Sequence, residues 1–130
     1  MGPRDVQVCE ATVPDLPAVL NVLDGGGLAT DAGALRSALE RGDVLVAVAD
    51  DGGRERVLGA LALDGREITA LAVRRRRRGQ GIGTALVDVA ATRRDRLVAG
   101  FDPRVRPFWE SLGFDVEPAD EPGRYSGVRD

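Results

Sequence analysis

The sequence contains no histidine, and all 18 of its basic residues are arginine because lysine is missing as well. Without histidine, Ser–His and Cys–His nucleophile pairs and His-ligated zinc sites are excluded. Without lysine, Schiff-base chemistry and the lysine-dependent Walker phosphate loop are excluded. Acid–base chemistry must therefore fall to carboxylates, to the single tyrosine Tyr125, to the single cysteine Cys9, to water or to the backbone.

Cysteine, aromatic residues and long apolar runs are also scarce. One cysteine cannot form an internal disulfide, no apolar run approaches the ~20 residues of a membrane helix, and residues 1–5 lack a signal-peptide core. We therefore expect a cytoplasmic protein that does not associate with membranes. A net charge of −3 and 4% aromatic residues argue against nucleic-acid binding. The length of 130 residues predicts one domain, spanning 1–130.

Apolar periodicity and turn residues predict an alternation of strands and helices in the order β-α-α-β-β-β-α-β-α-β-β. Strands are expected at 6–10, 44–49, 57–63, 68–73, 97–101, 114–117 and 125–129. Helices are expected after Thr12, between Asp31 and Gly42, from Gly81 onward, and over 103–112, where Phe108 is expected in the core. Asp64-Gly65 is expected to form a two-residue hairpin turn. This order predicts an α/β fold with a mixed sheet and helices on both faces.

Five consecutive arginines lead into three alternating glycines between Val73 and Thr84. A glycine backbone can curl so that successive N–H groups point at one spot, and a helix N-terminus adds about half a positive charge there. The segment therefore predicts an anion site, most plausibly for a phosphate or pyrophosphate. A dinucleotide-binding fingerprint fits weakly because the glycine spacing differs and little chain follows, and a Walker loop lacks its lysine.

The same segment, with Arg78, Gly81 and Gly83 in the pattern R-x-x-G-x-G/A, resembles the coenzyme-A-binding turn of the GNAT superfamily of N-acyltransferases. Downstream, Phe108-Trp-Glu-Ser-Leu-Gly-Phe114 resembles the F-Y-x-x-x-G-F signature of that superfamily, and residues 10–17 resemble its first strand and helix. The resemblance covers nearly the whole chain. It implies a single GNAT-like domain with a central, mostly antiparallel mixed sheet flanked by helices.

The resemblance also implies acetyl-CoA as co-substrate and assigns its contacts, with no metal. Arg78 and the turn receive the pyrophosphate, and the strand before the turn pairs with the pantetheine arm. One or two of arginines 74–78 are expected at the phosphates, and most of the others in solvent. The implied cofactor-binding residues are Leu71, Val73, Arg78, Gly79, Gln80, Gly81, Ile82, Gly83, Thr84 and Trp109.

For catalysis, the resemblance points to Glu67 as general base, acting through water; the alternative is a solvated acid at a hairpin mouth. Strand alternation predicts that Glu67 shares a face with Thr69, Leu71 and Val73. Trp109 stands where the superfamily usually has a tyrosine, and an indole cannot transfer a proton. Trp109 either packs against the cofactor or belongs to the core, and Tyr125 or water would supply the acid.

Two functions remain open from the sequence. The first is an N-acetyltransferase that transfers an acetyl group from acetyl-CoA to a primary amine of a small molecule or protein. The alternative is a catalytically weak or inactive coenzyme-A-binding module that regulates or senses. Both are compatible with a homodimer. Thiol release across a panel of amines separates them.

Overall fold

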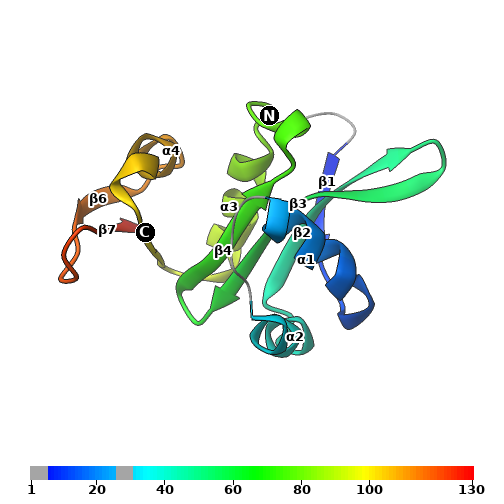
Figure 1. Ribbon diagram of the computed structural model, residues 1–130, viewed down its shortest axis with the longest axis horizontal. Helices are drawn as coiled ribbons and strands as arrows, with labels where there is room; N and C mark the ends of the chain where they lie inside the picture. Colours follow the sequence, from blue (N-terminus) through cyan, green and yellow to red (C-terminus); the bar gives the residue numbers. More distant parts are fainter. Residues whose placement is uncertain (1–5, 26–30) are drawn as a thin grey trace.

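The computed structural model describes residues 6–25 and 31–130, which form one seven-stranded mixed sheet with helices on both faces (Figure 1). The strand order across the sheet is β1-β2-β3-β4-β5-β7-β6. Neighbouring strands are antiparallel except β4 and β5, which are parallel. The predicted fold class is confirmed. The strands are β1 (Val6–Glu10), β2 (Val44–Asp51), β3 (Arg54–Asp64), β4 (Glu67–Val73), β5 (Leu97–Phe101), β6 (Asp115–Pro118) and β7 (Tyr125–Arg129).

The helices are α1 (Leu16–Gly25), α2 (Ala32–Arg41), α3 (Ile82–Arg93) and α4 (Arg106–Ser111), with short 3₁₀ turns η1 (Val13–Asp15), η2 (Arg75–Arg77) and η3 (Pro103–Val105). Local capping explains where they begin and end. Asp31 Oδ1 accepts hydrogen bonds from the backbone N–H of Gly33 at 2.8 Å and Ala34 at 3.2 Å, and Gly42 ends α2 in the left-handed conformation. The predicted helix over 103–112 is divided into η3 and α4.

Strand β2 lies at the centre of the core, because helices cover both of its faces. Val44, Val46 and Val48 pack against α1 and α2, whereas the alternate residues of β2 pack toward α3. Figure 1 shows α1 and α2 on one side of the sheet and α3 on the other. All residues from 44 to 49 are buried, as their continuously apolar sequence predicts.

A β-bulge in β4 changes which residues share a face. Ala62 pairs with Ala70 and Leu63 pairs with Ile68, so Thr69 is an extra residue in β4. Alternation restarts after the bulge, and Ile68 therefore packs in the same cluster as Leu71 and Val73. Glu67 alternates with Ile68 and thus lies on the opposite face. The prediction that Glu67 shares a face with Leu71 and Val73 is wrong for this reason.

Two smaller predictions also need correction. The two-residue hairpin loop between β3 and β4 is Gly65-Arg66, because Asp64 still pairs with Glu67. Phe108 is 42% exposed instead of buried in the core, because α4 turns its neighbour Trp109 inward.

The sheet divides between β4 and β5. Among the described residues the two strands share a single register pair, Glu67 with Val98, supported by a 2.9 Å hydrogen bond from Val98 N to Arg66 O. Beyond that pair the strands diverge, and the group β5, β7, β6 and α4 lies apart from the C-terminal end of β4 (Figure 1). The edge of β4 that follows Glu67 is therefore open toward β5.

Candidate active site

A glycine turn connects the end of β4 to α3. Gly79 and Gly81 have φ angles of 77° and 81°, in the left-handed region that favours glycine. Gly81 is the N-cap of α3 and has no side chain to cap it, and the first helical bond runs from Ala85 N to Gly81 O at 3.0 Å. The N–H groups of Ile82, Gly83 and Thr84 therefore have no acceptor within the helix, and they lie where the sequence predicts an anion site.

Arg78 closes this turn from the strand side. Its Nε donates to Val73 O at 3.1 Å, and its backbone N donates to Arg75 O at 3.3 Å. Its side chain is exposed, and within the described chain its two Nη groups make no hydrogen bond. Arg78 thus presents two charged donors beside the unpaired N–H groups of α3, which suits a diphosphate.

A groove of about 530 Å³ runs from this turn along the open edge of β4 toward α4. It contains the predicted residues Leu71, Val73, Arg78, Gly79, Gly81, Ile82, Gly83 and Thr84. Gln80 and Trp109 are absent from its lining among the described residues. The structure therefore brings most of the predicted cofactor-binding residues into one groove.

The aromatic side chain in this groove is Phe108, not Trp109. Phe108 and Val105 are each 42% exposed and line the groove opposite the glycine turn. Trp109 is 8% exposed; it stacks on Phe101 with centroids 5.3 Å apart and meets Phe114 edge-on at 5.1 Å. The spacing of three residues between Val105 and Phe108 could have indicated this exposed apolar pair from the sequence.

These features fit coenzyme A. Unpaired N–H groups and the Arg78 guanidinium suit the diphosphate, the open backbone edge of β4 can pair with an amide-containing arm, and Val105 and Phe108 offer apolar contact to that arm. A side chain added at Gly83 would meet Phe108 Cζ at 3.7 Å, so the turn and α4 face each other across a narrow space.

A second groove lies at the other end of β4, where the strand still pairs with β5. It brings together Glu67 from β4 and Tyr125 from β7, with Glu121 and Arg124 from the loop before β7. Arg106 lies over the Tyr125 ring at 5.2 Å from its centroid. The sequence did not indicate that Glu67 and Tyr125 share a groove, because they are far apart in the chain. The parallel contact between β4 and β5 brings them to the same groove.

The arginine run is divided by its contacts. Arg74 is half-buried and tied down: its Nε donates to Val57 O at 2.7 Å, and its Nη1 donates to Asn21 Oδ1 at 2.9 Å. Arg74 therefore joins α1 to the sheet, a structural role that the sequence did not indicate. Arg75 and Arg76 are exposed, in agreement with the expectation that most of the run is solvated.

Neither a membrane-spanning helix nor a metal-binding cluster occurs in the described residues. No helix in the described part of the chain is both long enough and apolar enough to cross a membrane. Across residues 6–25 and 31–130, no cluster of three or more acidic or cysteine side chains could hold a metal ion.

The splayed mixed sheet and the glycine turn at the start of α3 define the architecture of an acyl-CoA N-acyltransferase. Residues 40–116 match the sequence model of the acetyltransferase (GNAT) domain. This chain belongs to the GNAT acetyltransferase family.

Solved structures show the same fold at low sequence identity. The PaiA N-acetyltransferase of Thermoplasma acidophilum, solved with coenzyme A, superposes with a TM-score of 0.74 at 13% identity, over 96% of this chain and 98% of that one. Rv2747 of Mycobacterium tuberculosis, also solved with coenzyme A, gives 0.71 at 20% identity, over 94% and 97%. An agmatine N-acetyltransferase gives 0.72 at 15% identity, over 96% and 99%. A comparison with curated protein sequences found no match.

Proposed function

We propose that this protein is an N-acetyltransferase that transfers the acetyl group of acetyl-CoA to a primary amine. The observation that carries the proposal is the uncapped start of α3, which opens with Arg78 onto a groove along the open edge of β4. Residues 79–84, including Gln80, would hold the diphosphate by their backbone N–H groups. Leu71 and Val73 would pair with the pantetheine arm, and Phe108 would pack on it.

In the reaction, the amine nitrogen attacks the thioester carbonyl carbon, the C–N bond forms, and the C–S bond breaks with release of coenzyme A. An alkylammonium has a pKa near ~10, so it must first lose a proton. We propose that Glu67 accepts this proton as the general base, directly or through a water molecule in the groove that Glu67 and Tyr125 line. Backbone N–H groups at the open edge of β4 near Leu71 would stabilise the oxyanion.

The departing thiolate takes a proton from Tyr125 or from water, and the second proton that the amine nitrogen loses on becoming an amide goes to water. Trp109 cannot supply it, because its indole donates a hydrogen bond without transferring a proton. A thiol pKa of about 8.5 makes the thiolate a tolerable leaving group, so turnover does not require a positioned acid. Trp109 contributes instead by supporting Phe108, whose ring it meets edge-on at 5.5 Å.

The chemistry around Glu67 indicates the class of acceptor. Glu67 and Glu121 face a groove that also contains Arg124, and a protonated amine would be attracted to the two carboxylates. A structural neighbour of this chain is an agmatine N-acetyltransferase, which acts on a cationic amine. We therefore place small cationic amines first among acceptors to test.

The indole of Trp109 favours a second candidate, a coenzyme-A-binding sensor with little turnover, because an indole at this position cannot donate a proton to the thiolate. The two functions are separated by measuring thiol release from acetyl-CoA with a panel of polyamines, aminoglycosides and peptide N-termini. Release that depends on an added amine supports the transferase. Micromolar binding of coenzyme A with no release for any amine would leave the sensor.

A further inference from the structure

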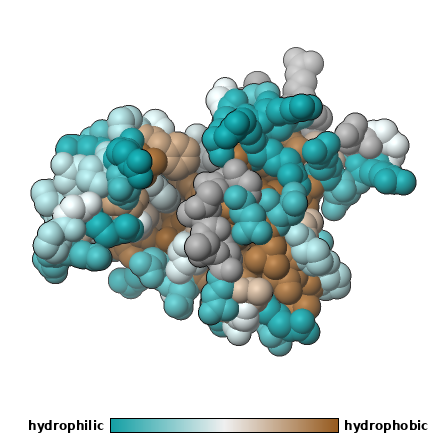
Figure 2. Space-filling model, in the orientation of Figure 1, coloured by the Kyte–Doolittle hydropathy of each residue, from teal (hydrophilic) through white to brown (hydrophobic). Residues whose placement is uncertain are grey.

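The groove that Glu67 and Tyr125 line also contains two charged residues from the loop before β7, Glu121 and Arg124. Its volume is about 520 Å³, and its walls come from β4, β5, that loop and the start of β7. Figure 2 shows hydrophilic residues over the end of the molecule that α4, β6 and β7 form, at the left of the view. A small polar molecule therefore suits this groove.

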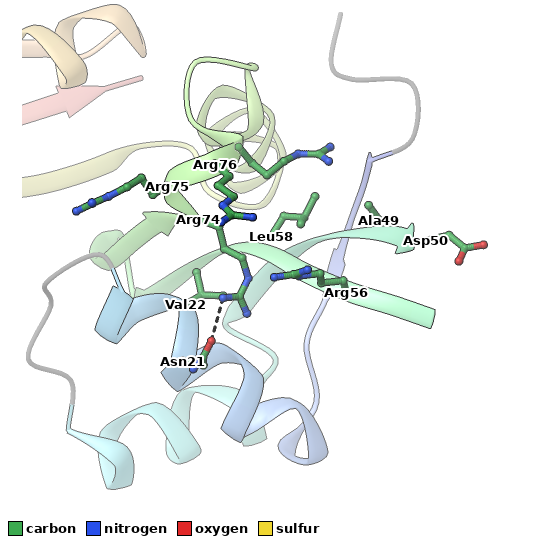
Figure 3. A pocket seen from close by; sticks show the side chains of 10 residues that line it. Asn21, Val22, Ala49, Asp50, Arg56, Leu58, Arg74, Arg75 and Arg76 are labelled. Atoms are coloured by element: carbon green, nitrogen blue, oxygen red, sulfur yellow. Dashed lines mark hydrogen bonds between the residues drawn. The ribbon is translucent and has the colours of Figure 1, made fainter. Parts of the chain in front are cut away.

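The guanidinium group of Arg124 makes no hydrogen bond and no ion pair within the described part of the chain. Its charge acts on Asp102 without a hydrogen bond, because Asp102 Oδ1 already accepts from N and Nε of Arg104 at 2.9 and 3.0 Å. Arg74, in a cavity of about 490 Å³ beside α1, is by contrast bound by Asn21 Oδ1 at 2.9 Å (Figure 3). Arg124 therefore keeps its N–H donors for a ligand in the groove.

A glycine in β5 places Arg124 near Glu67. A Cβ built at Gly100 would lie 3.9 Å from Arg124 Nη2, so the guanidinium group lies beside the backbone of β5. Gly100 is two residues beyond Val98, which pairs with Glu67. Two residues of a strand span about 6.6 Å and paired strands lie about 4.8 Å apart, so the Cα atoms of Gly100 and Glu67 are roughly 8 Å apart or slightly more. One small molecule can therefore contact both Glu67 and Arg124.

The three charged side chains of this groove match the charges of a basic α-amino acid. A guanidinium group binds a carboxylate through two parallel N–H donors, so Arg124 suits the carboxylate of such a molecule. Glu67 suits the neighbouring α-amine, and Glu121 offers a second carboxylate to a cationic side chain. A diamine without a carboxylate brings only positive charge to Arg124, and like charges repel.

We propose that Arg124 determines acceptor specificity by binding a carboxylate, and that the preferred acceptor is a basic α-amino acid and not the corresponding diamine. This inference rests on the proposed function, which places the acceptor amine at Glu67. Arg124 holds the carboxylate, and the α-amine nitrogen then attacks the thioester carbonyl carbon of acetyl-CoA. The C–N bond forms and the C–S bond breaks, which gives an N-acetyl amino acid and coenzyme A; the protons follow the route given above.

The test compares amino acids with the amines that their decarboxylation gives: lysine with cadaverine, ornithine with putrescine, and arginine with agmatine. Each compound is titrated calorimetrically into the protein saturated with coenzyme A, so the measurement of binding needs no acetyl transfer. We expect at least one amino acid to bind the parent protein at least tenfold more tightly than its amine, and Arg124→Gln to abolish that preference by weakening the amino acid alone. A parent protein that binds each amine as tightly as its amino acid, or binds neither, would overturn the proposal.

Arg66→Gln is the matched control, because Arg66 is exposed next to Glu67 in the chain but is not among the described residues that line the groove. Equal losses of amino acid affinity in Arg66→Gln and Arg124→Gln would reduce the effect to general charge and refute the role of Arg124. Both variants should bind coenzyme A like the parent, since neither residue lines the groove of the glycine turn.

Thiol release from acetyl-CoA, measured separately, distinguishes this inference from the proposed function. Amino acid binding that depends on Arg124, without thiol release from any acceptor, would support the carboxylate site and refute the transferase. Thiol release that is equal for amino acids and amines, and unchanged in Arg124→Gln, would refute the role of Arg124 and leave the transferase.

Discussion

Two alanine substitutions two residues apart should move the stability of this protein in opposite directions. Gly81 has a φ of 81°, and a Cβ built there meets nothing within 4 Å, so Gly81→Ala carries only the cost of left-handed backbone. That cost is about 1–2 kcal/mol. Gly83 lies inside α3, and its added Cβ would meet Phe108 and Val73 at 3.7 and 3.9 Å, which is ordinary contact. Gly83→Ala should therefore stabilise by up to ~1 kcal/mol.

The free energies of unfolding of the two variants should thus differ by about 1–3 kcal/mol. For a chain of this size each kcal/mol shifts the melting temperature by roughly 3–5 °C, so thermal unfolding by circular dichroism should separate their midpoints by roughly 3–15 °C. Gly83→Ala should melt above the parent protein and Gly81→Ala below it, both measured without ligand.

The same pair tests the anion site. Alanine at 81 makes the left-handed conformation of the turn costly by about 1–2 kcal/mol, so the arrangement that points the N–H groups of α3 at the groove is less populated and coenzyme A should bind about tenfold more weakly. Gly83→Ala keeps those N–H groups, so it should lose less affinity than Gly81→Ala. Ligand at one hundred times its Kd should stabilise the parent and Gly83→Ala by about 2.7 kcal/mol. A Gly81→Ala variant that melts like the parent, or binds coenzyme A equally well, would refute the role of this turn.

Three further predictions concern the aromatic pair, the second groove and the cysteine. Trp109→Ala should destabilise the protein by about 3–5 kcal/mol, because it empties a buried aromatic site. Phe108→Ala should weaken the binding of coenzyme A with a much smaller loss of stability. Denaturant titrations of both variants check this, and equal losses of stability would contradict the assignment. Glu67→Gln should lower kcat/KM by about 10²–10⁴-fold and change the pH–rate profile, and Tyr125→Phe should have a smaller effect. If the pH–rate profile of Glu67→Gln is unchanged, Glu67 is not the base. Partial burial, together with the carboxylates of Glu55 and Asp15, raises the pKa of the Cys9 thiol. Iodoacetamide should therefore alkylate Cys9 slowly at neutral pH, and faster only at a pH above the pKa of an ordinary thiol. Rapid labelling of Cys9 at neutral pH would contradict this prediction.

Much of the fold followed from local signals. The caps at Asp31 and Gly42 placed α2, and the unbroken apolar run of β2 indicated burial on both faces. The glycine turn was found by spacing alone, because left-handed backbone and a helix start are properties of a few consecutive residues. These predictions held because each depends on neighbours in sequence.

The predictions that failed depended on distant contacts. Alternation along β4 is broken at Thr69, since the register with β3 admits one extra residue there, and this moved Glu67 to the other face. Trp109 and not Phe108 is buried, because the side of α4 that carries Trp109 packs against Phe101 and Phe114. Helical spacing alone does not predict which side of α4 is buried.

The sequence by itself determined the family, the element order and the place of the glycine turn before α3, because those reside in contiguous motifs. Only the tertiary structure decided that Phe108 and not Trp109 faces the groove, that Glu67 and Tyr125 line one groove, and that Arg74 joins α1 to the sheet. These pairings join strands and helices far apart in the chain. They are set by register and packing, which local residue patterns do not encode.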